Sequence, residues 1–241
     1  MNKIKISAVS YTNTKPFIYG IKHSSVLEKI ELSLDIPADC AKKLIENQVD
    51  IGLIPVAAIP FVPKAHIISS YCIGSVGAVN SVFIFSDVSI QEIKTVKLDP
   101  QSRTSNNLAK VLLKNHFKVE VDFITDPSVE TDAIVLIGDR TFGRKADFKY
   151  AYDMGEEWMK FTGLPFMYAA WVANKPIPEE FLKDFDEALG LGIQNIPTVI
   201  EELPVIEGID IEDYLLHKLN FNLTPEKLEA KDLFLKLIEE L

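Results

Sequence analysis

Short apolar runs with the two-residue period of β-strands alternate along this chain with runs that have the period of a helix. Strands are predicted over residues 3–9, 49–53, 67–73, 80–86, 95–99, 119–124, 133–137 and 165–173. Helices are predicted over residues 36–45, 103–116 and 153–159, as one or two turns over 56–62, and from Pro178 onward, with the last over 228–237. This alternation is typical of an α/β protein.

The strand and helix pattern begins again after residue 86, which indicates a second α/β unit. We expect lobe 1 to comprise residues 1–86 and 174–241, and lobe 2 to comprise residues 87–173. The apolar strand at 165–173 is the expected return crossing, so that two strands join the lobes. Because ligands of open α/β sheets bind outside the carboxyl ends of the strands, a ligand cleft is expected between the lobes.

Composition and charge exclude several classes of protein. The chain has 241 residues, of which 47% are hydrophobic and 25% charged, so it can bury a sizeable core and lacks the composition of a disordered or membrane protein. Its net charge of −10 and its scattered basic residues argue against a nucleic-acid partner. Residues 1–20 show no secretion signal, and we expect a cytoplasmic protein with no membrane partner.

Cysteine and histidine spacing gives no sign of a metal or redox site. Cys40 and Cys72 do not form a Cys-x-x-Cys pair and are expected to be small core residues. The four histidines are far apart in the sequence and include no pair at i,i+4. A metal site is therefore not expected.

The stretch 98–105 runs from a strand through a tight turn into a helix, and it carries the first candidate site. Hydroxyl side chains and free backbone N–H groups collect at a helix N-terminus, where they can hold a small anion. Ser102, Thr104 and Ser105 supply the hydroxyls, and Arg103 adds a planar cation that suits a carboxylate or phosphate. The alternative is that a serine only caps the helix and Arg103 points to water.

A second polar cluster, at residues 10–16, follows the first strand. Two such clusters at strand ends predict two walls of one cleft. Asn13 precedes Thr14 here, and on local sequence alone an Asx turn is the simpler interpretation of this asparagine.

Four segments, 9–16, 50–59, 70–74 and 98–105, resemble chorismate dehydratase, the family that opens the futalosine route to menaquinone. The segments occur in the family's order and spacing, and the similarity continues to the end of the chain. The resemblance implies an α/β, two-lobed fold like that of type II periplasmic binding proteins, with two crossing strands. It also implies a lyase that removes water from chorismate to give 3-[(1-carboxyvinyl)oxy]benzoate, with no redox or metal cofactor.

The resemblance also nominates site residues. One of the two carboxylates of chorismate would bind Arg103 and the hydroxyls beside it, and the other would use neutral donors. The candidate substrate-binding residues are Ser10, Tyr11, Ser81, Arg103, Thr104, Ser105 and Gly138. The candidate catalytic residues are Asn13, as a contact to the substrate or the leaving hydroxyl, and Asp139, which is alternatively a turn residue. A substrate carboxylate is an alternative proton acceptor to Asp139.

Two other functions remain open from the sequence. One is the sister enzyme of the same pathway, which makes dihydroxynaphthoate on the same fold, although no histidine here falls at a strand end suited to act as its base. The other is a non-catalytic solute-binding protein for small anions. The sequence does not determine the oligomeric state.

Overall fold

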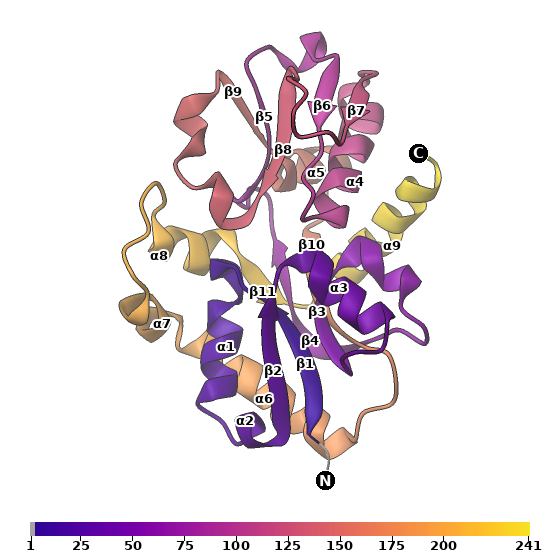
Figure 1. The fold of residues 1–241 in the computed structure, drawn as a ribbon. Coiled ribbons are helices and arrows are strands. Elements are labelled where there is room, and N and C mark those ends of the chain that lie inside the picture. Colours follow the sequence, from indigo (N-terminus) through magenta and orange to yellow (C-terminus); the bar gives the residue numbers. More distant parts are fainter. Residues whose placement is uncertain (1–2) are drawn as a thin grey trace.

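The computed structural model describes residues 3–241 and contains two β-sheets, each covered by helices (Figure 1). The first sheet has the strand order β11-β4-β10-β3-β1-β2. Its strands are β1 (Ile4–Val9), β2 (Ile30–Asp35), β3 (Ile51–Pro55), β4 (His66–Ser75), β10 (Phe166–Ala173) and β11 (Asn220–Asn222). Strands β1, β2 and β3 are parallel, and β10 runs antiparallel between β3 and β4. All residues of β3 and β10 are buried, which is why both read as unbroken apolar runs.

The second sheet has five strands in the order β7-β6-β8-β5-β9. Its strands are β5 (Val82–Ser86), β6 (Thr95–Lys97), β7 (Asp122–Ile124), β8 (Ala133–Ile137) and β9 (Tyr150–Asp153). Strand β6 is parallel to β7 and β8, whereas β5 is antiparallel to β8 and β9. The carboxyl ends of β6 and β8 therefore lie at the same edge of this sheet.

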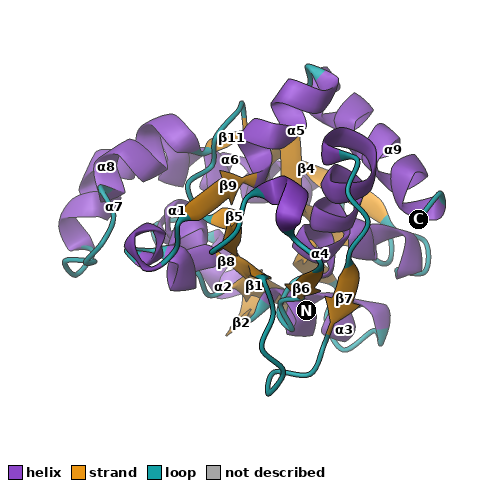
Figure 2. Ribbon diagram, turned by 90° about the horizontal axis from the view of Figure 1, so that it is seen from above, coloured by secondary structure: helices purple, strands orange, loops and turns teal. Residues whose placement is uncertain are grey.

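Helices surround both sheets. The part of the molecule built on the first sheet is called the first half, and the part built on the second sheet is called the second half. The first half carries α1 (Lys15–Lys22), α2 (Val26–Lys29), α3 (Pro37–Ile45), α6 (Glu179–Gln194), α7 (Ile196–Glu202), α8 (Ile211–Asp213) and α9 (Pro225–Glu239). The second half carries α4 (Arg103–Val111) and α5 (Met154–Thr162). In Figure 1, α1 and α6 lie to the left of the first sheet and α3 lies to its right. Seen from above, α7 and α8 lie at one side of the molecule and α9 at the other (Figure 2). None of the helices within residues 3–241 has the length and apolar character needed to span a bilayer.

Short 3₁₀ and π turns complete the chain. The 3₁₀ turns are η1 (Thr12–Thr14), η2 (Val56–Phe61), η3 (Ile90–Glu92), η5 (Gly138–Thr141) and η6 (Arg144–Asp147), and the π turns are η4 (Leu112–Phe117) and η7 (Tyr214–Lys218). The helix predicted over 103–116 is thus α4 continued by a π turn. The one or two turns predicted over 56–62 form the 3₁₀ turn η2, which lies between Pro55 and Pro63.

The predicted strands and helices are mostly present, but the expected lobe boundaries are not the boundaries of the sheets. Strand β5, assigned to lobe 1 by the expected boundary at residue 86, pairs with β8 and β9 in the second sheet. Strand β10, assigned to lobe 2 by the boundary at residue 173, pairs with β3 and β4 in the first. The chain crosses between the sheets at residues 76–81 and 154–165. The sequence pattern did not predict α1, α2, β2, β9 and β11.

A buried carboxylate ties the two crossing segments together. The Asp153 side chain accepts hydrogen bonds from the backbone N–H groups of Val79 and Asn80 on the first crossing, at 3.1 and 2.7 Å. It also accepts from Gly155 and Glu156 at the start of α5, at 2.9 and 3.1 Å. Four N–H donors compensate the carboxylate for its removal from water. Asp153 therefore fixes the first crossing segment to the start of α5.

Helices α1 and α6 cross so closely that only glycine fits at the contact. A Cβ atom on Gly192 would lie 1.8 Å from the carbonyl oxygen of Pro16, and one on Gly20 would lie 1.8 Å from that of Ala188. The obstructing atoms belong to the backbone, so no side-chain rotation relieves the overlap.

We predict that Gly192→Ala lowers the free energy of unfolding by about 1–3 kcal/mol, because overpacking at the crossing outweighs the roughly 1 kcal/mol that alanine gains over glycine in a helix. Urea unfolding measures this. Gln194→Ala, at an exposed position of the same helix, is the control and should change stability by less than about 0.5 kcal/mol. Equal stability of the two variants would show that the helices can move apart at no cost.

Candidate functional site

A small cavity lies between the two halves, at the carboxyl ends of β1, β3 and β8. Its volume is about 60 Å³. Its apolar wall is formed by Val9, Pro37, Pro55, Ile73, Val79, Val82, Ile137, Ala169 and Leu219. Its remaining lining is Tyr11, Asn13, Ser81, Ser102, Thr104, Ser105, Gly138 and Tyr168. Within residues 3–241 no charged side chain lines it, and no cluster of three or more His, Cys, Asp or Glu side chains is arranged to hold a metal ion.

The N-terminus of α4 forms one wall of the cavity. Ser102 is the N-cap, and its Oγ accepts from the backbone N–H of Ser105 at 3.1 Å while donating to Ser105 Oγ at 2.9 Å. Thr104 Oγ1 accepts from the backbone N–H of Ala57 in η2 at 3.0 Å, which connects the two halves. All three hydroxyl residues are buried. The positive end of the helix dipole therefore faces an enclosed space, an arrangement suited to an anion.

Asn13 and Ser81 form a second polar part of the cavity wall. Asn13 lies in η1, directly after β1, and its Oδ1 accepts from Thr14 Oγ1 at 3.1 Å. Ser81 lies at the end of the first crossing, and its Oγ accepts from the phenol of Tyr214 at 2.9 Å. Tyr214 was not predicted, because nothing in its local sequence relates it to Ser81.

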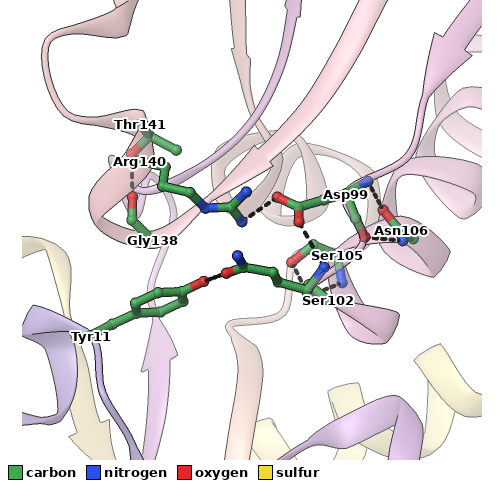
Figure 3. Close-up of polar contacts among 9 residues, drawn as sticks. Tyr11, Asp99, Ser102, Ser105, Asn106, Gly138, Arg140 and Thr141 are labelled. Atoms are coloured by element: carbon green, nitrogen blue, oxygen red, sulfur yellow. Dashed lines mark hydrogen bonds and ion pairs between the residues drawn. The ribbon is translucent and has the colours of Figure 1, made fainter. Parts of the chain in front are cut away.

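A second polar network lies beside the cavity, at the end of β6 (Figure 3). Tyr11 reaches across from the first half and donates to the side-chain oxygen of Gln101. Arg140 Nη2 pairs with the fully buried carboxylate of Asp99 at 2.6 Å. Burial raises the pKa of the Tyr11 phenol, although the neighbouring Arg140 guanidinium opposes that rise. The guanidinium that pairs beside this site is thus Arg140, which the sequence analysis did not single out.

Asp139 bridges the two halves and does not line the cavity. Its carboxylate accepts from the backbone N–H of Thr12 at 3.1 Å and from Thr12 Oγ1 at 2.9 Å. Burial raises the pKa of Asp139, and the hydrogen bonds from Thr12 and the charge of Lys15 only partly offset this. Because its oxygens already face Thr12, the geometry favours Asp139 as a contact that holds the halves together.

Two other predicted residues also lie outside the cavity lining. Ser10 is exposed at the end of β1. Arg103 is exposed, and its guanidinium lies 4.5 Å from the ring centre of Phe61. The reason is helical geometry, since Ser102 and Ser105 are three positions apart and share a face, whereas Arg103 at the first helical position points away from it. The structure brings together Tyr11, Asn13, Ser81, Thr104, Ser105 and Gly138 from the predicted set.

The site is closed in this structure. Typical ligand pockets measure roughly 300–1,000 Å³, so a cavity of about 60 Å³ admits a metabolite only after the halves separate. The contacts that would break join Thr12 to Asp139, Ala57 to Thr104 and Tyr11 to Gln101. Chemically, the enclosed lining offers neutral hydrogen-bond donors and one helix N-terminus.

Comparison with known proteins agrees with this architecture. The sequence matches the family described as "Menaquinone biosynthesis" over residues 4–240. The fold is similar to that of protein AF1704 from Archaeoglobus fulgidus, at a TM-score of 0.75 and 16% identity over 99% of this chain and 97% of that one.

The fold is also similar to that of the Candida albicans CA3427 gene product, described as having the generic periplasmic binding protein fold. The TM-score is 0.71 at 14% identity, over 100% of this chain and 91% of that one. The periplasmic aliphatic sulphonate binding protein SsuA from Escherichia coli gives 0.59 at 15% identity, over 100% and 92%. The predicted α/β fold like that of periplasmic binding proteins is confirmed.

Gly138 is required where the second half meets Tyr11. Its φ is +63°, and a Cβ atom there would lie 2.6–3.0 Å from the Tyr11 ring. Gly163 is a matched control, because its φ is +73° and a Cβ atom there would meet nothing within 4 Å.

We predict that Gly138→Ala and Gly163→Ala each lose about 1–2 kcal/mol of stability from the left-handed backbone alone. Gly138→Ala should lose about 1–3 kcal/mol more, because the Tyr11 ring must also move. Urea unfolding of both variants measures the difference. Equal losses would contradict a tight contact between Tyr11 and Gly138.

Proposed function

Because the chain belongs to the menaquinone biosynthesis family, we propose that it is a chorismate dehydratase of the cytoplasm, acting at the first step of the futalosine route. The observation that carries this proposal is the cavity between the halves, which is lined both by the N-terminus of α4 and by Asn13 and Ser81. Once the halves separate to admit a ligand, this set of groups suits a small dianionic ring substrate. It offers an anion site on one wall and donors for a leaving hydroxyl on the other.

The proposed reaction breaks one ring C–H bond and the ring C–OH bond of chorismate, and the proton and hydroxide leave together as water. The ring becomes aromatic, and this supplies the driving force. No oxidant or reductant takes part. The protein's tasks are to bind the substrate in one orientation, to exclude bulk water and to stabilise the charge that develops on the departing oxygen.

Each polar wall has a role in this scheme. The backbone N–H groups in the first turn of α4 that the Ser102 side chain does not cap, together with the hydroxyls beside them, bind one substrate carboxylate. Asn13 and Ser81 donate hydrogen bonds to the departing hydroxyl. The described cavity lining contains no carboxylate and no imidazole, so a carboxylate of the substrate takes the ring proton and passes it to the leaving oxygen.

A non-catalytic role in binding a small anion is the second candidate. It is favoured by the likeness to a sulphonate-binding protein and by the same α4 N-terminus, which would suit a sulphonate as well as a carboxylate. The sister enzyme that makes dihydroxynaphthoate is less favoured. No histidine lies among the described residues of the cavity wall to act as its base.

We predict that the purified protein converts chorismate to a product that is lighter by one water and has the ultraviolet absorption of a substituted benzoate. Mass spectrometry and absorbance on the same sample measure this. Recovery of unchanged chorismate would contradict the proposed dehydratase activity. Unchanged chorismate that stays bound to the protein in stoichiometric amount would support the binding function.

Substitution of Asn13 tests more directly whether this side chain hydrogen-bonds the departing hydroxyl. We predict that Asn13→Ala lowers kcat by about 10²–10³, the usual cost of losing one hydrogen bond made in the transition state, with a smaller effect on KM. Ser10→Ala, three residues earlier and outside the cavity, is the control and should keep wild-type kcat. If Asn13→Ala instead lowers the free energy of unfolding by about 1 kcal/mol and leaves kcat unchanged, Asn13 is only a turn residue and the assignment is wrong.

A further inference from the structure

Tyr214 is a buried phenol that does not line the cavity, yet it is hydrogen-bonded to Ser81, which does. It begins the π turn η7 and has 1% of its surface exposed. Its ring packs edge-to-face on Phe142 of the second half, with ring centres 5.4 Å apart. π turns occur often at functional sites, because the wider turn displaces a side chain from the regular helical path. Tyr214 is thereby held from both halves of the molecule.

Tyr214 is hydrogen-bonded to Ser81. Its O–H donates to Ser81 Oγ at 2.9 Å. Burial raises the pKa of the Tyr214 phenol far above its usual value, so the proton stays on this oxygen at neutral pH. Asn13 lines the same cavity as Ser81, and its side-chain oxygen accepts from Thr14 Oγ1.

We infer that Tyr214 is a positioning residue, which directs the hydroxyl proton of Ser81 into the cavity. A serine hydroxyl has one proton and two acceptor positions. Since Tyr214 occupies one acceptor position of Ser81, the proton of Ser81 is available to a ligand. The resulting chain runs from Tyr214 through Ser81 to the ligand, and the first donor strengthens the second.

This inference rests on the proposed function for its consequence. In the dehydration, Ser81 acts as a hydrogen-bond donor to the departing hydroxyl and not as a base. Tyr214 touches no substrate, and its effect passes through Ser81. The phenol comes from a segment 133 residues away from Ser81 in the sequence, so the C-terminal part of the chain contributes to the site.

The kinetic test compares two Tyr→Phe substitutions that each remove one hydrogen-bonded phenol. Tyr214→Phe should lower kcat at least about 10-fold, which is less than the roughly 10²–10³-fold cost of removing a donor that touches the reacting atoms, and should change KM little. Tyr152→Phe is the control, because the Tyr152 oxygen accepts from the backbone N–H of Ile90 at 2.9 Å, in the second sheet. Its turnover should equal that of the wild type. Equal turnover of both variants would overturn the inference.

A double mutant separates positioning from simple packing. In a Ser81→Ala background, Tyr214→Phe should lower kcat less than about 3-fold, because its main route to the substrate is already lost. A full loss in that background, accompanied by a matching fall in thermal midpoint, would make Tyr214 a packing residue and overturn the inference.

A spectroscopic readout keeps this test separate from the proposed function. In protein labelled with ¹³C at tyrosine Cζ, Ser81→Ala should shift the Tyr214 signal, identified by its loss in Tyr214→Phe, and leave the Tyr152 signal in place. A shift in a protein that does not dehydrate chorismate would refute the proposed function alone and support the hydrogen-bond chain. No shift would overturn the inference whether or not turnover is observed.

Discussion

The N-terminus of α4 is the feature on which the candidate site depends, because it supplies positive potential where the described lining has no cationic side chain. A buried guanidinium or ammonium would cost several kcal/mol in lost hydration, whereas helix N–H groups are already fixed and partly buried. The dipole contributes up to about 2 kcal/mol in such a setting, and each hydrogen bond to a charged group about 1.5–3 kcal/mol. Together they suffice to hold a small anion reversibly. Arg103, exposed over Phe61, is not needed inside for this purpose.

The site requires the two halves of the molecule to come together, because its groups are divided between them. The α4 end lies on the second half, whereas Asn13 and the Ala57 N–H lie on the first, so the site is complete only when the halves meet. Several hydrogen bonds that join the halves around the cavity, such as those from Ala57 to Thr104 and from Tyr11 to Gln101, link neutral groups and contribute about 0.5–1.5 kcal/mol each. Hydrogen bonds of this strength can be exchanged for hydrogen bonds to water when a ligand enters. Asp153 bonds the first crossing segment to the start of α5, independently of these contacts.

Strands and helices could be predicted from the sequence where the pattern of apolar residues is strong. They could not be predicted where pairing between distant parts of the chain determines the structure. Strand β8 and helix α6 were predicted because their periods are clear, whereas the short β9 and β11 depend on pairing with distant strands. The lobe boundaries were misplaced because a buried strand such as β5 reads the same in either sheet. Ser102 and Ser105 were identified from residue type, but residue type does not show which face of α4 meets the cavity, and Arg103 lies outside the cavity lining. Tyr214 gave no signal at all.

The central claim is that an uncharged cavity performs the proposed dehydration, with Asp139 holding the halves together. The pH dependence of kcat tests it most directly, for the wild type and for Asp139→Asn. Burial raises the pKa of Asp139. If Asp139 were the catalytic base, kcat of the wild type would therefore rise with pH through that elevated pKa, and this rising limb would be absent from the pH profile of Asp139→Asn. The account predicts a flat kcat between about pH 5.5 and 8.5 in both proteins, because neither a substrate carboxylate nor a phenol changes charge there. A limb that is present in the wild type and absent from Asp139→Asn would contradict it.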